Sequence, residues 1–263
     1  MLQQTYMSRV LAKYPVFLRR FPSLQKLAGA RQKDVVMAWQ GMGYNNRAVR
    51  LHRLANTVVG NFGGELPRTY PDLLSLPGVG RYTANALLSS AFRKTVPIVD
   101  VNIRRVFSRI FWPMTSTAAV RPQEEIWDLA GKLVPPRGAY KWNQALMDMG
   151  AMICTARSPR CNLCPVARLC ASKNSMTRVV PSTRNRSSTG DVTPNRIYRG
   201  RIIEVLRRHT RRQHLSTDTL GRAIHPRYGK TRRRWLESLL TGLEKDGLIK
   251  RSTMGRWRRI SLA

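Results

Sequence analysis

Apolar residues recur every three or four positions along most of the first 150 residues. This spacing is the period of an amphipathic helix. It predicts helices over residues 15–27, 33–39, 47–59, 70–75, 82–91, 102–111, 123–134 and 142–149. The alternation that is typical of strands is confined to the last twenty residues. The pattern therefore predicts a mainly α-helical domain over residues 1–175.

The composition changes near residue 176. Residues 176–195 are rich in Ser, Thr, Arg, Asn, Pro and Gly, which indicates a linker. The remaining part, 196–263, predicts helices at 198–208, 217–224 and 231–246, then strands at 248–252 and 256–262 that turn at Gly255. Three helices followed by a two-stranded wing predict a basic, winged-helix-like α+β domain.

The chain has 47 Lys and Arg residues against 14 Asp and Glu residues, a net charge of +33. Residues 1–175 contribute +17 and residues 176–263 contribute +16. In a chain with enough apolar residues to fold, this charge predicts a polyanionic partner, most simply DNA in two separable footprints. The alternative is a basic surface that only aids solubility. In the C-terminal domain the expected DNA contacts, with protein contacts as the alternative, are Arg232, Arg233, Arg234, Arg256, Arg258 and Arg259.

No apolar run reaches the roughly 18 to 20 residues that span a bilayer. The N-terminus also lacks the charged region, apolar run and cleavage site of a secretory signal. These features predict an intracellular protein, which we expect to be cytoplasmic, nucleoid-associated and of prokaryotic type. We expect a monomer with no membrane partner.

All four cysteines lie in one short segment, as Cys154, Cys161, Cys164 and Cys170. In a reducing compartment this clustering favours a metal site over disulfides. Four thiolates in one loop suit a [4Fe–4S] cluster, in which each cysteine binds one iron. Zinc sites more often use two separated C-x2-C pairs, and only one such pair is present. The spacing favours iron–sulfur, with zinc as the alternative.

Leu76-Pro77-Gly78-Val79-Gly80 lies between two predicted helices. Two glycines allow a tight turn that leaves the backbone N–H groups of Gly78, Val79 and Gly80 uncovered. The following helix begins there with the positive end of its dipole. The turn therefore predicts a sequence-independent DNA phosphate contact, although a plain helix–helix connection would look the same.

Asp100 follows an apolar run and precedes a predicted helix. The simplest interpretation is a helix N-cap, and the pattern alone favours it. The alternative is a catalytic carboxylate aimed at a cation that develops in a transition state.

Together, these segments resemble the helix-hairpin-helix DNA glycosylases that carry an iron–sulfur loop, and within them the adenine glycosylase (MutY) branch. The resemblance covers residues 1 to about 175. It is carried by Met1–Thr5, Gly41–Tyr44, Leu76–Ala84, Val99–Val106 and Met147–Cys154.

The resemblance implies a base-excision-repair enzyme that hydrolyses the N-glycosidic bond of adenine opposite 8-oxoguanine or guanine. Asp100 would stabilise the oxocarbenium-like sugar, and this replaces the N-cap preference. Gln3 and Gln4 would enter the duplex at the target pair, and Asn102 would contact DNA. Tyr44 would wedge into the stack beside the base opposite the target and help to flip the target nucleotide. Tyr82 stands where the endonuclease III branch has a lysine. Without that amine no Schiff base forms, which implies monofunctional base removal.

Two departures from the branch leave alternatives open. The acid that protonates adenine would be a glutamate two residues before the position of Met1, so we expect the sequence to be N-terminally truncated or its start codon misplaced. The branch also carries a β-rich, Nudix-like C-terminal domain that reads 8-oxoguanine, whereas residues 196–263 predict a different domain. The alternatives are thymine excision from T·G mispairs, or a DNA-binding protein without catalysis.

Overall fold

The computed structural model describes residues 1–3, 5–114, 116, 119–177, 193–209, 215–254 and 257–263. The chain divides into two compact units. We call the first the terminal unit, and it comprises Met1–Leu66, Leu76–Gly78 and Ser188–Ala263. We call the second the central unit, and it comprises Pro67–Ser75 and Val79–Ser187.

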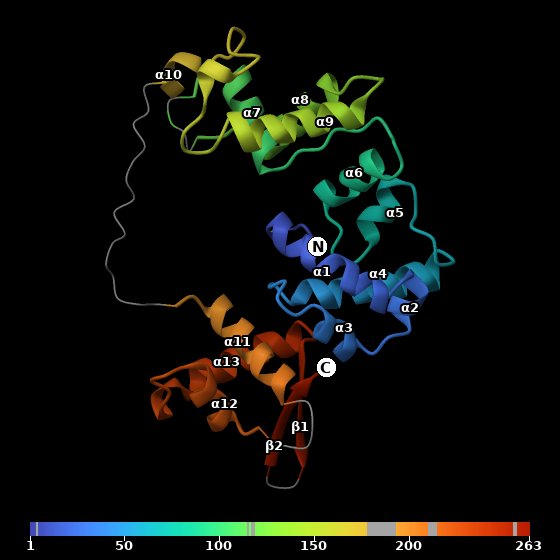
Figure 1. Cartoon of the computed structure of the whole chain (residues 1–263), viewed down its shortest axis with the longest axis vertical. Helices are drawn as coiled ribbons and strands as arrows, with labels where there is room; N and C mark the ends of the chain where they lie inside the picture. Colours follow the sequence, from blue (N-terminus) through green and yellow to red (C-terminus); the bar gives the residue numbers. More distant parts are fainter. Residues whose placement is uncertain (4, 115, 117–118, 178–192, 210–214, 255–256) are drawn as a thin grey trace. The chain divides into compact units, whose positions relative to one another are not determined.

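The terminal unit joins helices from both ends of the chain (Figure 1). Its N-terminal helices are α1 (Met7–Arg20), α2 (Leu24–Ala28), α3 (Gln32–Ala38) and α4 (Asn46–Asn61). Its C-terminal elements are α11 (Asn195–Arg208), α12 (Thr217–Ile224), a 3-10 turn (Lys230–Arg232), α13 (Arg233–Lys245), β1 (Ile249–Met254) and β2 (Trp257–Leu262).

One predicted helix proved to be two. The expected helix over 15–27 begins earlier, at Met7, and is interrupted between Arg20 and Leu24. Pro22 causes the break, because a proline disfavours helical backbone at the residue before it, here Phe21. Ser23 then starts α2 by accepting a 3.2 Å hydrogen bond from the Lys26 N–H.

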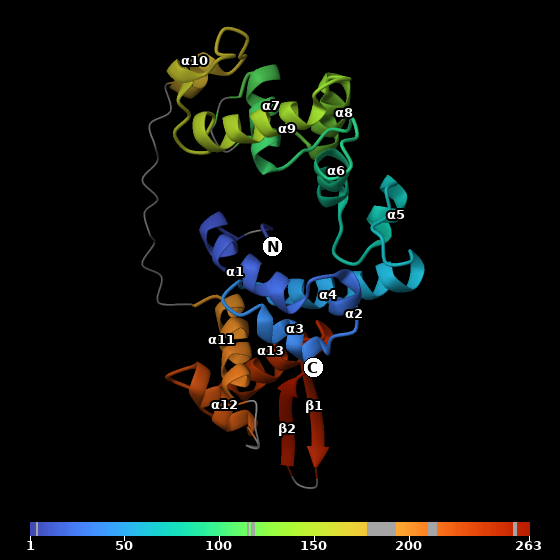
Figure 2. The ribbon, with the colours of Figure 1, turned by 45° about the vertical axis from the view of Figure 1, so that its right-hand side comes forward.

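The C-terminal helices and strands match the predicted order (Figure 2). β1 and β2 form an antiparallel pair in which Ile249 lies opposite Leu262 and Arg251 lies opposite Ile260. The small sheet beside three helices confirms the α+β class predicted for this part. The predicted turn residue Gly255 and Arg256, and the side chains of Arg258 and Arg259, lie outside the described residues.

The two ends of the chain share one hydrophobic core. Val35, Val36 and Trp39 of the N-terminal helices belong to the same buried cluster as Ile202 and Leu240. Polar contacts cross the same boundary, since Gln32 Nε2 donates a part-buried hydrogen bond to the Gly247 carbonyl at 2.6 Å. The compact units therefore divide the chain differently from the predicted boundaries 1–175, 176–195 and 196–263, which stay a prediction about function.

Every secondary-structure element in the described residues of the central unit is a helix or a helical turn. It contains α5 (Tyr70–Ser75), α6 (Arg81–Ser90), α7 (Val101–Phe111), α8 (Gln123–Leu133), α9 (Ala139–Asp148), a π-helix (Met149–Ile153), a 3-10 turn (Cys161–Leu163) and α10 (Lys173–Thr177). Ile103 and Phe107 of α7 pack against Ile126 and Trp127 of α8. The π-helix and α10 were not predicted.

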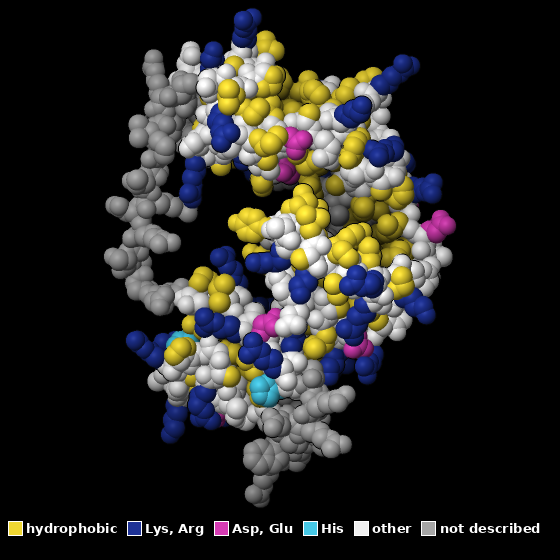
Figure 3. Space-filling view, in the orientation of Figure 1, with side chains coloured by type: hydrophobic (Ala, Val, Ile, Leu, Met, Phe, Trp, Pro, Cys, Tyr) yellow, Lys and Arg dark blue, Asp and Glu magenta, His cyan; other side chains and the backbone are white. Residues whose placement is uncertain are grey.

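These elements confirm a mainly α fold with a small C-terminal α+β part. Among the described residues, no helix combines the length and the apolar character needed to cross a membrane. Lys and Arg side chains are widespread on the face shown in Figure 3, while Asp and Glu are few.

Candidate active site and metal centre

Asp100 is the N-cap of α7, as the sequence pattern alone favoured. Its Oδ1 accepts a 2.7 Å hydrogen bond from the Ile103 N–H. The other carboxylate oxygen, Oδ2, accepts one from Asn102 Nδ2 at 2.9 Å. The carboxylate thus lies in the positive field of a helix start, fixed by two donors. This geometry fixes a negative charge, which a catalytic role would also need.

A series of hydrogen bonds leads from this carboxylate to the cysteine segment. Arg105 is buried, and its Nη2 donates to Asn102 Oδ1 at 2.9 Å and to the Gly150 carbonyl at 2.7 Å. Its Nε donates to the Cys154 carbonyl at 2.9 Å. Burial, and next the nearby Arg109, lower the pKa of Arg105. Arg105 therefore links the start of α7 to the π-helix and the first cysteine.

Gly150 permits the close approach of the π-helix to α7. A Cβ at this position would lie 2.7 Å from the Asn102 Cβ and 3.3 Å from the Asn102 backbone carbon and oxygen. Single π-helical turns are frequent at functional sites, because the extra residue changes the direction of nearby groups. Here the turn brings the Cys154 carbonyl to Arg105.

Tyr82 lies in α6, and its side chain is 40% exposed. Burial, and next the negative charge of Asp100, raise the pKa of the Tyr82 phenol. The phenol is therefore neutral near pH 7 and electrostatically coupled to Asp100. The predicted pair Asp100 and Tyr82 thus lies in one region of the central unit, together with Asn102.

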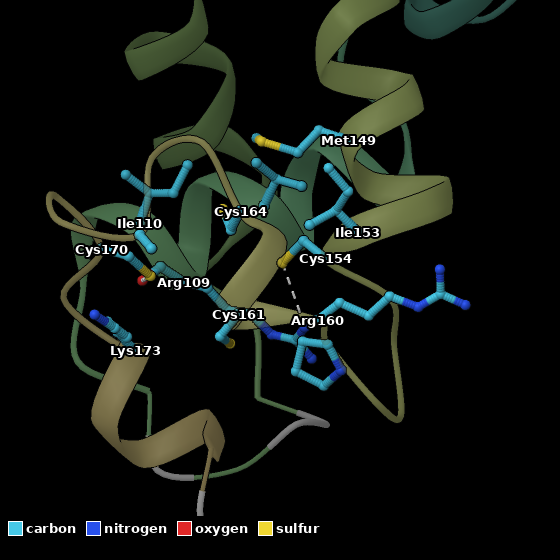
Figure 4. A pocket seen from close by; sticks show the side chains of 13 residues that line it. Arg109, Ile110, Met149, Ile153, Cys154, Arg160, Cys161, Cys164, Cys170 and Lys173 are labelled. Carbon is cyan, nitrogen blue, oxygen red and sulfur yellow. Dashed lines mark hydrogen bonds between the residues drawn. The ribbon is translucent and has the colours of Figure 1, made fainter.

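The four cysteines line one small cavity of about 30 Å³ (Figure 4). All four are free thiols of intermediate exposure. Buried Arg109 closes one side, where its Nη1 lies 3.4 Å from Cys154 Sγ and donates to the Thr155 carbonyl at 2.7 Å. Burial raises the pKa of the Cys161 and Cys170 thiols, and the other cysteines raise both further. The thiolate forms of these two cysteines are therefore unfavourable without a nearby cation, which bound iron would supply.

The donor set consists of four thiols, with no His, Asp or Glu among the described residues that line the cavity, and it fits an iron–sulfur cluster. A zinc ion would gather its thiolates at about 2.3 Å from one centre. An iron–sulfur cube gives each cysteine its own iron, which spreads the sulfur atoms around a larger group.

The predicted hairpin turn connects α5 to α6. Gly78 has a φ of +83°, which favours glycine, and a Cβ there would lie 3.1 Å from the Arg50 Cβ. Gly80 is the extended N-cap of α6, and Val79 lies between the two glycines. The helix–turn–helix geometry is as predicted, and phosphate binding by its N–H groups stays a prediction.

In the terminal unit, Arg47 holds the N-terminal segment against the Gly41–Tyr44 loop. Its guanidinium donates to the Gln3 carbonyl, to Thr5 Oγ1 at 2.7 Å and to the Met42 carbonyl at 3.1 Å. It also lies 5.7 Å from the centre of the Tyr44 ring. The Tyr44 side chain is 47% exposed at a φ of +43°, and Gln4 lies outside the described residues. Gln3 and Tyr44 are thus brought to one surface.

The sequence reasoning missed the structural roles of three arginines described above, namely Arg47, Arg105 and Arg109. The chain has 47 basic residues, and nothing in its composition distinguishes an arginine that becomes buried and hydrogen-bonded from one that stays exposed. The usable signal for Arg105 was its spacing, three residues after Asn102 on the same face of a predicted helix.

Comparison with known families assigns two segments of the chain. The family described as HhH-GPD superfamily base excision DNA repair protein matches residues 1–132. The iron–sulfur binding domain of endonuclease III matches residues 154–170, which hold all four cysteines. The loop is therefore a [4Fe–4S] site, and the zinc alternative is not supported.

Related proteins extend the assignment. The adenine DNA glycosylase of Mycobacterium tuberculosis (strain H37Rv) is 37% identical over 98% of this chain and 82% of its own length. The human adenine DNA glycosylase is 40% identical over 66% of this chain and 32% of its own. A thermostable thymine-DNA glycosylase has a similar structure, with a TM-score of 0.61 and 32% identity over 66% of this chain and 80% of that one. The chain therefore belongs to the HhH-GPD superfamily of base excision DNA repair proteins, and within it to the adenine DNA glycosylases.

Proposed function

We propose that this protein removes adenine from DNA where it is paired with 8-oxoguanine or guanine. The observation that carries the proposal is the Asp100 carboxylate, fixed by Ile103 and Asn102 at the start of α7. Cleavage of an N-glycosidic bond builds positive charge on the sugar, and a fixed carboxylate stabilises that charge. The target base is taken from the relatives, which are named adenine DNA glycosylases.

Base removal without strand cleavage follows from Tyr82. A bifunctional glycosylase forms a Schiff base through an amine, and the Tyr82 phenol beside Asp100 offers none. Water is then the nucleophile, and the product is an abasic site.

The remaining residues position the DNA. The N–H groups of Gly78, Val79 and Gly80 would bind a phosphate at the start of α6. Gln3, Gln4 and Tyr44 would contact the bases at the mispair, and Asn102 would contact the DNA beside Asp100. The protein acts as a monomer in the cytoplasm. Cys154, Cys161, Cys164 and Cys170 would hold the [4Fe–4S] cluster, which would fix the loop that these cysteines share.

Release of free adenine is the test. The substrates are duplexes with A·8-oxoG, A·G or T·G, and strand scission is measured before and after alkali. We expect adenine release from the first two, scission only after alkali, and no release by Asp100→Asn.

A general acid that protonates the departing base contributes roughly 10²- to 10⁴-fold, so each assay is run with the unchanged protein and with a variant that carries an added N-terminal segment containing a glutamate. Thymine release from T·G without adenine release would favour the thymine alternative. Tight duplex binding with no release of any base in either form would favour a binding protein.

A further inference from the structure

The terminal unit contains a second cavity, of about 370 Å³, in the part of the chain that the structure describes. One wall is the Met42–Asn46 segment, and the opposite wall is the start of α11. Its floor is apolar and buried, with Met42, Ile203 and Leu243 each at most 1% exposed. This size and lining are typical of sites that hold part of a ligand.

The rim of this cavity is cationic. Arg9 of α1 and Arg196 of α11 line it, and neither side chain makes a hydrogen bond or ion pair with another described residue. A third arginine, Arg199, is already paired with Asp246. No Asp or Glu is among the described residues that line the cavity. Two exposed, unpaired guanidinium groups beside an apolar floor indicate an anionic ligand with an apolar part.

Arg207 fixes the two walls to each other. It is buried, pairs with Glu204, and donates to the Val36 carbonyl at 2.6 Å and to Asn45 Oδ1 at 3.0 Å. These acceptors lie on both sides of the loop that carries Tyr44. Because α11 is held against this loop, the cavity is preformed next to the Tyr44 side chain.

Open backbone lies on both walls. A Cβ on Gly43 or on Gly200 would meet no atom within 4 Å. Both glycines line the cavity, so a flat group can approach the main chain there. A nucleotide within a DNA strand combines this shape with a phosphate, whereas a simple anion would not need the apolar floor.

We propose that this cavity binds one nucleotide unit of the DNA strand that Tyr44 enters, with Arg9 and Arg196 on its backbone phosphate and the sugar or base over the apolar floor. The proposal rests on the proposed function in requiring mispaired DNA and contact of Tyr44 with its bases. It gives residues 196–263 a direct part in holding the strand opposite the excised base.

The test is a coupling experiment on binding. The duplex carries 2′-fluoro-2′-deoxyadenosine opposite guanine, because fluorine at C2′ disfavours the cationic sugar and prevents cleavage. Single methylphosphonate linkages, which are uncharged, are placed one at a time in the guanine strand. The proteins are the unchanged chain, Arg9→Ala, Arg196→Ala, and the matched control Arg208→Ala. Arg208 is exposed, lies on α11 like Arg196, and does not line the cavity.

We expect Arg9→Ala and Arg196→Ala to weaken binding about 5- to 20-fold and to lower the salt slope by about one each. One linkage near the mispair should weaken binding by the unchanged chain and by Arg208→Ala, but not by Arg196→Ala. Such loss of sensitivity identifies the phosphate that Arg196 contacts.

Equal sensitivity of all four proteins at every linkage would overturn the proposal. Binding of dGMP to the unchanged chain but not to Arg196→Ala, without linkage coupling, would also overturn it and indicate a free-nucleotide site. The binding assay needs no catalysis, so failure of adenine release with intact coupling would leave this inference standing.

Discussion

Asp100 and Cys154 are joined by hydrogen bonds through only two side chains, Asn102 and Arg105. The carboxylate proposed for catalysis therefore shares its support with the first cysteine of the [4Fe–4S] loop. A substitution near Asp100 should therefore affect the cysteine loop, and one in the loop should affect Asp100, because every member of the series is buried or half-buried.

Arg105→Lys should weaken the hydrogen bonds at both ends of this series, near Asp100 and at Cys154. A lysine cannot place donors on Asn102, Gly150 and Cys154 together, because its ammonium lacks the planar fork of arginine. Each buried acceptor left unpaired costs about 1–3 kcal/mol. We expect the cluster's visible absorption to be lost on heating roughly 2 to 10 °C earlier, with slower adenine release. Arg157→Lys, at an exposed loop position, is the control. Identical melting of the two variants would contradict the link.

Two substitutions at Asp100 separate the helix cap from the charge. Asparagine is also a good N-cap, so Asp100→Asn should melt within about 2 °C of the unchanged protein. Asp100→Ala loses the bond to the Ile103 N–H and should be less stable by about 1 kcal/mol. Both should abolish adenine release. Circular dichroism recorded during heating measures the stability of each variant. Full activity of Asp100→Asn would rule out the electrostatic role.

Gly150→Ala should be destabilising, because the new Cβ would lie 2.7 Å from the Asn102 Cβ and close to its backbone. We expect a loss of roughly 1–3 kcal/mol and weakened base release. Gly131→Ala in α8 is the matched control, since a Cβ there meets nothing within 4 Å. Alanine is the better helix former, so that variant should gain up to about 1 kcal/mol. Urea unfolding compares them, and effects of the same sign would contradict the close approach.

Removing the C-terminal part should damage the N-terminal helices. A chain that ends at Thr177 would expose Val35, Val36 and Trp39, which are now covered in a core shared with α11 and α13. We therefore expect aggregation or strong binding of a hydrophobic dye, rather than the loss of one DNA footprint alone. A soluble fragment with native circular dichroism would contradict this expectation and support two independent domains.

The metal content gives a direct check on the cysteine loop. We expect about four irons per chain and a broad visible absorption after anaerobic purification. Cys164→Ser should remove most of the iron and weaken DNA binding, while Ser158→Ala on the same loop should not. Stoichiometric zinc in a colourless protein would contradict the assignment.

The sequence by itself determined the helices, the metal loop and the cap. Periodicity located most helices because a helix that packs on a core repeats its apolar residues every three or four positions. The cysteine spacing was sufficient because all four ligands lie within one short segment. Asp100 was predictable for the same reason, since an N-cap forms its hydrogen bond with a residue close by in the sequence, here Ile103.

Only the tertiary structure decided the contacts that join distant segments. Nothing near Arg207 in the sequence indicates that it bonds to Val36 and Asn45, more than 160 positions away. Arg105 likewise meets Cys154 only after a π-helix has turned the chain. The physical reason is that burial of an arginine depends on which carbonyls the folded chain brings within reach, and a chain this basic offers many equivalent candidates. For that reason the charge of the chain predicted a DNA partner. Which arginines are paired and structural, and which are left unpaired, was decided by the fold.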